Sequence, residues 1–86
     1  MAVKINTESI MNIGAFVKFH RKQAGLSRID LANIAGVGKT VIYDIENCKE
    51  TVRLKTLLSV MDALNISISL DSPLMNQYKA EDNARS

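Results

Sequence analysis

The segment from Leu26 to Asn47, with the sequence LSRIDLANIAGVGKTVIYDIEN, constrains the fold of this chain more than any other part. Ser27 is a good helix N-cap. Apolar residues recur after it at helical spacing, namely Ile29, Leu31, Ala32 and Ala35. Gly36 is expected to end this helix, because glycine readily adopts the left-handed conformation that closes many helices. A second helix is predicted from about Lys39 to Asn47.

The second predicted helix separates apolar and polar side chains onto opposite sides. At about 100° per residue, its apolar residues share one side, namely Val41, Ile42 and Ile45. Its polar residues fall within roughly 140° on the other side, namely Lys39, Thr40, Tyr43, Asp44 and Asn47. A short helix, a glycine turn and a second helix with such a polar ridge predict a helix-turn-helix, whose second helix enters the major groove of DNA. The alternative is that both helices simply belong to a small bundle.

Composition indicates one small domain without an active site. A chain of 86 residues with 47% hydrophobic and 5% aromatic residues fits a compact helical core of limited size. Metal-ligand clusters, nucleophile constellations and phosphate-binding glycine loops are not recognisable, so we expect no enzyme, no metal and no cofactor. The single cysteine, Cys48, cannot form an internal disulfide. A lone cysteine fits a reducing compartment, so we expect a cytoplasmic protein. No apolar run approaches the ~20 residues that span a membrane, and no signal peptide is visible, so we expect no membrane insertion.

Positive charge is concentrated around the predicted helix-turn-helix. From Lys18 to Lys55 there are eight basic and four acidic residues, which gives +4. Residues 56–86 hold two basic and four acidic residues, which gives −2. The surplus therefore lies where DNA phosphates would lie, although a mixed solvated surface is the alternative.

The remaining segments divide the chain into an arm, a domain, a strand and a tail. After an arm over residues 1–8, the domain is expected over 9–65, with a first helix from about Ser9 to Ala24 that Thr7 or Ser9 could cap. A fourth helix is predicted from an apolar stripe, namely Leu54, Leu57, Leu58, Met61 and Leu64. Residues 72–86 are expected to be a polar, flexible tail.

Residues 66–71 carry the pattern of a half-buried strand. Their apolar residues alternate with serines, namely Ile66, Ile68 and Leu70. A lone strand leaves its backbone groups unpaired, so the economical solution is pairing with the same strand of a second copy in a two-fold dimer. The alternative is an extended coil on the core.

The ordered motif G-L-S-R-x-x-L-A-x-x-A-G-V-x-x-x-x-I-x-x-I-E-N closely resembles the Cro/C1-type (Xre) helix-turn-helix family, over about residues 13–66. The resemblance implies an all-α, lambda-repressor-like bundle of four to five helices, and a repressor of the bacterial cytoplasm associated with the nucleoid. The terminal strand L-x-I-x-I-x-L looks like that of the HipB-type antitoxins and their y4mF-like relatives. That narrower resemblance implies a homodimer with an intersubunit sheet, a palindromic DNA operator and a HipA-type kinase toxin as partner.

The resemblance also implies roles for single residues. Arg28 would touch phosphate or a base edge. Gly38 stands where the family often has Ser or Thr, so the recognition helix would lack a side-chain cap and offer bare backbone N–H groups to phosphate. Lys39, Thr40 and Asp44 would occupy the base-reading positions, with Tyr43 beside them. Backbone contacts would come from three residues after that helix, namely Asn47, Lys49 and Arg53.

Two further features of the family concern structure. Arg21 and Glu46 would form a pair between the first and third helices, although Arg21 could instead reach phosphate. Cys48 stands where the family usually has glycine, so either Asn47 takes the positive φ or the turn is reshaped.

Three binding functions remain open. The first is an antitoxin that represses its own operon. The second is a solitary phage-type or metabolic repressor without a toxin. The third is a protein-interaction module whose DNA surface is vestigial.

Overall fold

The computed structural model describes residues 2–85, and the side chains of all of these except residues 10, 84 and 85. Residue 1 of the expected arm and residue 86 of the expected tail lie outside the described residues. Over this range there are five helices: α1 (Ile10–Gln23), α2 (Arg28–Ala35), α3 (Lys39–Glu46), α4 (Leu54–Ala63) and α5 (Met75–Arg85). The predicted all-α architecture is therefore confirmed.

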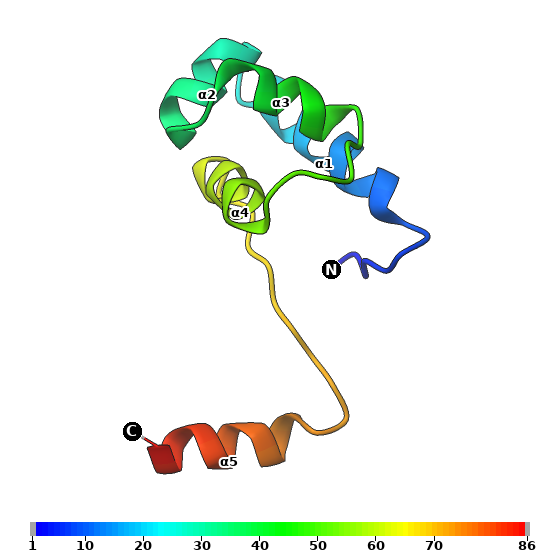
Figure 1. Ribbon diagram of the computed structural model, residues 1–86, viewed down its shortest axis with the longest axis vertical. Helices are drawn as coiled ribbons and strands as arrows, with labels where there is room; N and C mark the ends of the chain where they lie inside the picture. Colours follow the sequence, from blue (N-terminus) through cyan, green and yellow to red (C-terminus); the bar gives the residue numbers. More distant parts are fainter. Residues whose placement is uncertain (1, 86) are drawn as a thin grey trace.

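Helices α1 to α4 form one body from which α5 is separated (Figure 1). Helix α2 packs against α3 and α4, and α1 packs against α3. Helix α5 lies at the end of an extended linker, away from this body. The Cα radius of gyration is 15.1 Å, whereas a compact chain of this length has one of about 12 Å. The excess reflects the position of α5.

Local signals at both ends of α2 act as the sequence predicts. The Ser27 hydroxyl accepts a hydrogen bond from the Asp30 N–H at 3.0 Å, and the Asp30 carboxylate accepts one from the Ser27 N–H at 3.2 Å. This reciprocal capping satisfies two N–H groups at the start of the helix. Gly36 closes the helix at φ 70°, and the next N–H, from Val37, donates to the Ala32 carbonyl at 3.0 Å. The chain therefore turns at once toward α3.

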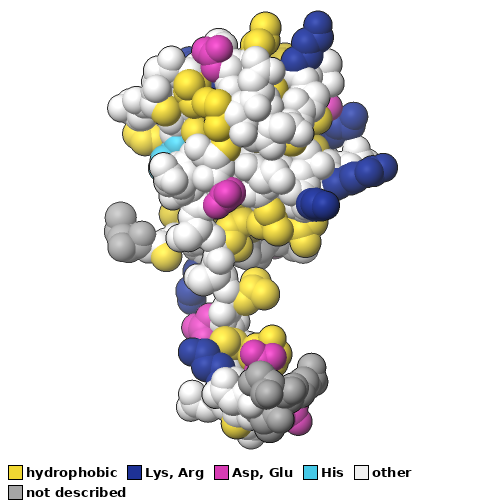
Figure 2. All heavy atoms as spheres, turned by 90° about the vertical axis from the view of Figure 1, so that its left-hand side faces the viewer, with side chains coloured by type: hydrophobic (Ala, Val, Ile, Leu, Met, Phe, Trp, Pro, Cys, Tyr) yellow, Lys and Arg dark blue, Asp and Glu magenta, His cyan; other side chains and the backbone are white. Residues whose placement is uncertain are grey.

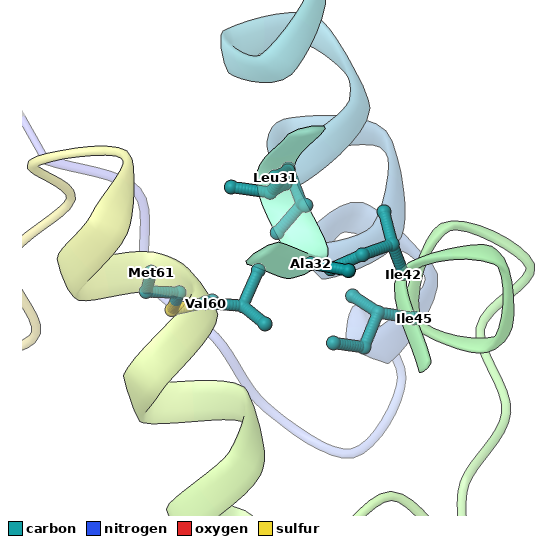
Figure 3. Packing of buried hydrophobic residues seen from close by; sticks show 7 residues of the cluster. Leu31, Ala32, Ile42, Ile45, Val60 and Met61 are labelled. Carbon is teal, nitrogen blue, oxygen red and sulfur yellow. The ribbon is translucent and has the colours of Figure 1, made fainter. Parts of the chain in front are cut away.

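The core lies between α1, α2, α3 and α4, and Figure 3 shows the part formed by α2, α3 and α4. Leu31 and Ala32 of α2 are enclosed between Ile42 and Ile45 of α3 and the side chains of α4. The buried apolar residues are Val17, Leu31, Ala32, Ile42, Ile45, Val60 and Met61. Because α3 buries its apolar side here, its opposite side is left to solvent.

Some residues of the predicted apolar stripes are exposed. Ile29 is 59% exposed, because Leu31 and Ala32 turn their side of α2 toward the core and Ile29 lies about 200° around the helix from Leu31. On α4, Leu54 and Leu58 are 69% and 42% exposed, while Val60 is fully buried. The four-helix body therefore keeps an apolar surface on α4 that its own residues do not cover.

The predicted strand over residues 66–71 is not formed. This segment is extended, but no strand is found among residues 2–85. The physical reason is that a strand needs a neighbour with which to exchange backbone hydrogen bonds, and one chain offers none. Ile66 is half-buried and packs against the core, whereas Ile68 and Leu70 are 51% and 86% exposed. The alternative of a coil on the core therefore holds only at the start of the segment.

Most of the predicted polar tail is helical, since α5 spans Met75–Arg85, a helix that the sequence did not predict. Ser72 begins the turn into the helix by accepting a hydrogen bond from the Leu74 N–H at 3.2 Å. The helix itself, MNQYKAEDNAR, includes seven good helix formers and contains neither glycine nor proline. Sequence periodicity could not reveal this helix, since only Met75 and Tyr78 are large and apolar.

Candidate nucleic-acid interface

Helix α3 presents a polar face to solvent. Ile42 and Ile45 anchor it in the core, which turns Lys39, Thr40 and Tyr43 outward. Asn47 follows the helix and is also exposed, and its side-chain amide donates to the Tyr43 carbonyl at 2.8 Å. Asp44 is half-buried. The structure therefore gathers the expected base-reading side chains at one exposed surface, with Asp44 set back from it.

The N-terminus of α3 has no side-chain cap. Gly38 holds the N-cap position with an extended backbone (φ −66°, ψ 148°), and its lack of a side chain leaves the first turn open. Because N–H groups at a helix N-terminus attract anions, this end of α3 is suited to a phosphate.

A buried carboxylate joins the three helices behind this surface. Arg21 of α1 donates to Glu46 of α3 through Nε at 2.6 Å and Nη2 at 3.1 Å. Its Nη1 donates to the Leu26 carbonyl at 2.9 Å. Arg28 of α2 donates to the same carboxylate through Nε at 3.3 Å. The pair expected from the family resemblance is present, and Arg28 joins it.

Burial and charge act in opposite directions on this network. Burial by itself raises the pKa of Glu46, but the hydrogen bonds and positive charges of Arg21 and Arg28 outweigh it, so the pKa lies below its usual value. The hydrogen bond with Glu46 raises the pKa of Arg21. Both groups are therefore charged at neutral pH, and the side chain of Glu46 is only 1% exposed.

The loop after α3 carries both charges and polar groups. Lys49 Nζ lies 3.6 Å from the Asp44 carboxylate. Lys49 therefore balances the negative charge of Asp44 beside the exposed face of α3. Arg53 is exposed at the N-cap of α4 and lines, with Asp44, Lys49 and Thr51, a shallow groove between α3 and α4. Figure 2 shows Lys and Arg side chains along one edge of the helical body.

Cys48 adopts the conformation that a glycine would favour. Its φ is 62°, whereas that of Asn47 is −97°. Of the two expected alternatives, a positive φ at Asn47 is therefore not found. Cys48 itself takes the left-handed conformation that a side chain disfavours. Its thiol donates to the Met11 carbonyl at 3.4 Å, which joins the loop to α1.

Gly14 of α1 was not predicted to matter, yet it lies against the end of α3. A Cβ atom at this position would lie 2.7 Å from the Ile45 carbonyl oxygen and 2.9 Å from that of Glu46. Only a glycine lets the two helices approach this closely. A single glycine within a predicted helix was the available signal, since glycine lowers helix stability and must have a compensating reason.

Sequence comparison decides the family. Residues 17–70, more than half of the chain, match the model of the helix-turn-helix family. The chain belongs to the Cro/C1-type helix-turn-helix family. The family member y4mF, an HTH-type transcriptional regulator of Sinorhizobium fredii, is 38% identical over 73 residues, which are 85% of this chain and 93% of y4mF. The immunity repressor of Bacillus phage phi105 is 31% identical over 78 residues, or 87% of this chain. The alignment spans about half of that repressor's length.

A HipB structure shares the fold of this family member. The solved HipA–HipB–O2–O3 complex contains a chain that superposes with a TM-score of 0.72 at 24% identity, covering 84% of this chain and 99% of the other. The homologues are thus helix-turn-helix transcriptional regulators. Over residues 2–85, no group of three potential metal ligands is found, and no helix is long and apolar enough to cross a membrane.

Proposed function

We propose that this helix-turn-helix protein is a repressor that binds a palindromic operator through α3. The observation that carries the proposal is the exposed polar face of α3, which Lys39, Thr40 and Tyr43 form beside an uncapped helix N-terminus. Lysine can donate to guanine, and a threonine methyl group can pack on thymine. Exposed Lys49 and Arg53 supply cations near the same surface.

Binding to the DNA upstream of its own gene tests this function. A mobility-shift titration at fixed salt should show tighter binding to that DNA than to an unrelated duplex of equal length. Both duplexes offer the same phosphate contacts, but only the operator adds the binding free energy of base contacts. Equal affinity for both duplexes would contradict sequence-specific repression of this promoter.

We further propose that the chain acts as a homodimer joined by residues 66–70. Ile68 and Leu70 are exposed, as are Leu54 and Leu58 of α4, which the segment follows. Figure 2 shows apolar side chains gathered where the linker leaves the body. Two copies related by a two-fold axis would pair these segments as antiparallel strands and cover the apolar surface of α4.

The substitution Ile68→Asp is expected to raise the dimer dissociation constant by about tenfold or more, since it buries an unpaired charge in the paired segment. Light scattering coupled to size exclusion measures this directly. Ser67→Asp is the matched control, because its side chain would lie on the opposite face of the strand. Wild-type monomers at tens of micromolar, roughly a weak-affinity regime, would contradict the dimer.

We propose, more specifically, that the repressor is the antitoxin of a HipA-like kinase toxin and regulates the operon of both. The support is the fold shared with HipB in the HipA–HipB–O2–O3 complex, and the alternating segment 66–70. Helix α5 is a suitable contact for the toxin, since it lies apart from the body, with Tyr78 of the helix and Leu74 just before it exposed.

Co-expression with the adjacent gene tests the antitoxin function. A HipA-type kinase encoded there should co-purify with the full chain, and deletion of residues 73–86 should reduce its recovery if α5 is the contact. Unchanged recovery would move the contact to α1 or α4.

The phage immunity repressor, at 31% identity, favours the second candidate, a solitary repressor. Absence of a toxin gene would support that candidate instead.

A further inference from the structure

Arg28 is the one residue of the buried network that reaches the exposed surface of α3. Its side chain is 42% exposed, whereas those of Arg21 and Glu46 are 9% and 1% exposed. Its guanidinium carbon lies 5.2 Å from the centre of the Tyr43 ring. One cation is thus held by a ring on α3 and by a carboxylate beneath it.

The charge of Arg28 is not needed to neutralise that carboxylate. Arg21 already makes two hydrogen bonds to Glu46, at 2.6 and 3.1 Å, and is itself buried. Arg28 approaches Glu46 at the longer distance of 3.3 Å, through Nε alone. Two guanidinium groups facing one carboxylate leave a net charge of +1 at the exposed end of the network.

Holding the side chain in place should matter for binding. A free arginine side chain loses considerable rotamer freedom when it fixes a ligand, and a guanidinium stacked on a ring has already lost part of it. The terminal nitrogens of Arg28 suit a phosphate, because two parallel N–H groups match two phosphate oxygens.

On the basis of the proposed function, we infer that Tyr43 is a positioning residue that holds Arg28 ready to bind a DNA phosphate. The ring of Tyr43 stacks on the guanidinium, and Glu46 fixes its Nε side. Tyr43 therefore contributes to DNA affinity through Arg28, in a way that does not depend on base sequence.

A double-mutant cycle tests this coupling. Binding of a mixed-sequence duplex of about three helical turns is measured by fluorescence anisotropy at several salt concentrations, for wild type, Arg28→Lys, Tyr43→Leu and the double variant. Both residues are at least partly exposed, so these variants should fold, and circular dichroism checks this. Tyr43→Phe is the matched control because it keeps the ring.

Each single substitution is expected to weaken binding roughly 3- to 10-fold, and the double variant should be no weaker than the weaker single one. Arg28→Lys should keep the salt slope, whereas Arg28→Gln should flatten it by about 0.9. Tyr43→Phe should bind more tightly than Tyr43→Leu, because it keeps the ring that stacks on Arg28. Losses that multiply in the double variant, or a Tyr43→Phe variant as weak as Tyr43→Leu, would overturn the inference. A wild-type protein that binds no duplex even at low salt would instead contradict the proposed function.

Discussion

Replacing Glu46 by glutamine is expected to destabilise the folded chain by about 3–5 kcal/mol at pH 7, because it leaves buried Arg21 without a counter-charge. In a small domain this is a large share of the total free energy of unfolding. The melting temperature should fall on the order of 20 °C. Thermal and urea unfolding followed by circular dichroism measure both quantities.

The Asp44–Lys49 pair provides a matched control for that substitution. Its two side chains are 31% and 56% exposed and lie 3.6 Å apart. Asp44→Asn should therefore change the unfolding free energy by no more than about 1 kcal/mol, as is usual for surface ion pairs. If Glu46→Gln cost no more than Asp44→Asn, the network would not stabilise the fold.

The effect of Glu46 should also depend on pH. Its pKa in the folded chain lies below the ordinary glutamate value of about 4.3. Its stabilisation is thus fully present above that value and is lost as the pH falls through the folded-state pKa, because the unfolded chain takes up the proton first. The difference between wild type and Glu46→Gln should shrink as the pH falls below about 5. A constant difference would contradict this assignment.

Replacing Gly14 by alanine is expected to destabilise the chain by about 1–3 kcal/mol, as overpacking does. The new methyl group would meet the carbonyl oxygens of Ile45 and Glu46 at distances below 3 Å, and backbone atoms at the end of α3 cannot easily move away. Alanine by itself stabilises a helix by about 1 kcal/mol relative to glycine. A net decrease in the free energy of unfolding would therefore show the clash directly. Urea unfolding gives the value.

The clash at Gly14→Ala should also shift α3 and so disturb the candidate interface, since Gly14 lies against the end of α3. DNA affinity of Gly14→Ala should fall even at a temperature where the variant is fully folded. Asn12→Ala, on the exposed side of the same helix, is the control and should leave both properties nearly unchanged. A Gly14→Ala variant more stable than wild type would contradict the close contact of α1 with α3.

The sequence predicts the helix-turn-helix well because its signals are local. Ser27 and Asp30 lie three residues apart, and Gly36 acts through its own backbone conformation, so neither depends on distant contacts. The family resemblance then implied the pair of Arg21 with Glu46, which the structure contains. The additional contact of Arg28 with Glu46 joins residues 18 positions apart on different helices, and no periodicity encodes it.

Residues 66–70, α5 and the conformation of Cys48 were harder to predict. Alternation at Ile66, Ile68 and Leu70 shows which side chains would share a face but does not show whether a neighbouring strand is present. Helix α5 has little apolar surface, so a hydrophobic pattern could not reveal it. Cys48 adopts a left-handed conformation that its side chain disfavours, because the surrounding turn determines the backbone there.

Selection of bound duplexes from a randomised pool tests the central claim, that α3 reads DNA, most directly. Wild type should enrich a palindrome whose half-sites lie about one helical turn apart. The double variant Lys39→Ala/Thr40→Ala should remain folded yet lose preference at the contacted positions, at a cost of roughly 1–3 kcal/mol per contact. No enriched motif for wild type, or the same motif for both proteins, would contradict the assignment of α3 as the recognition helix.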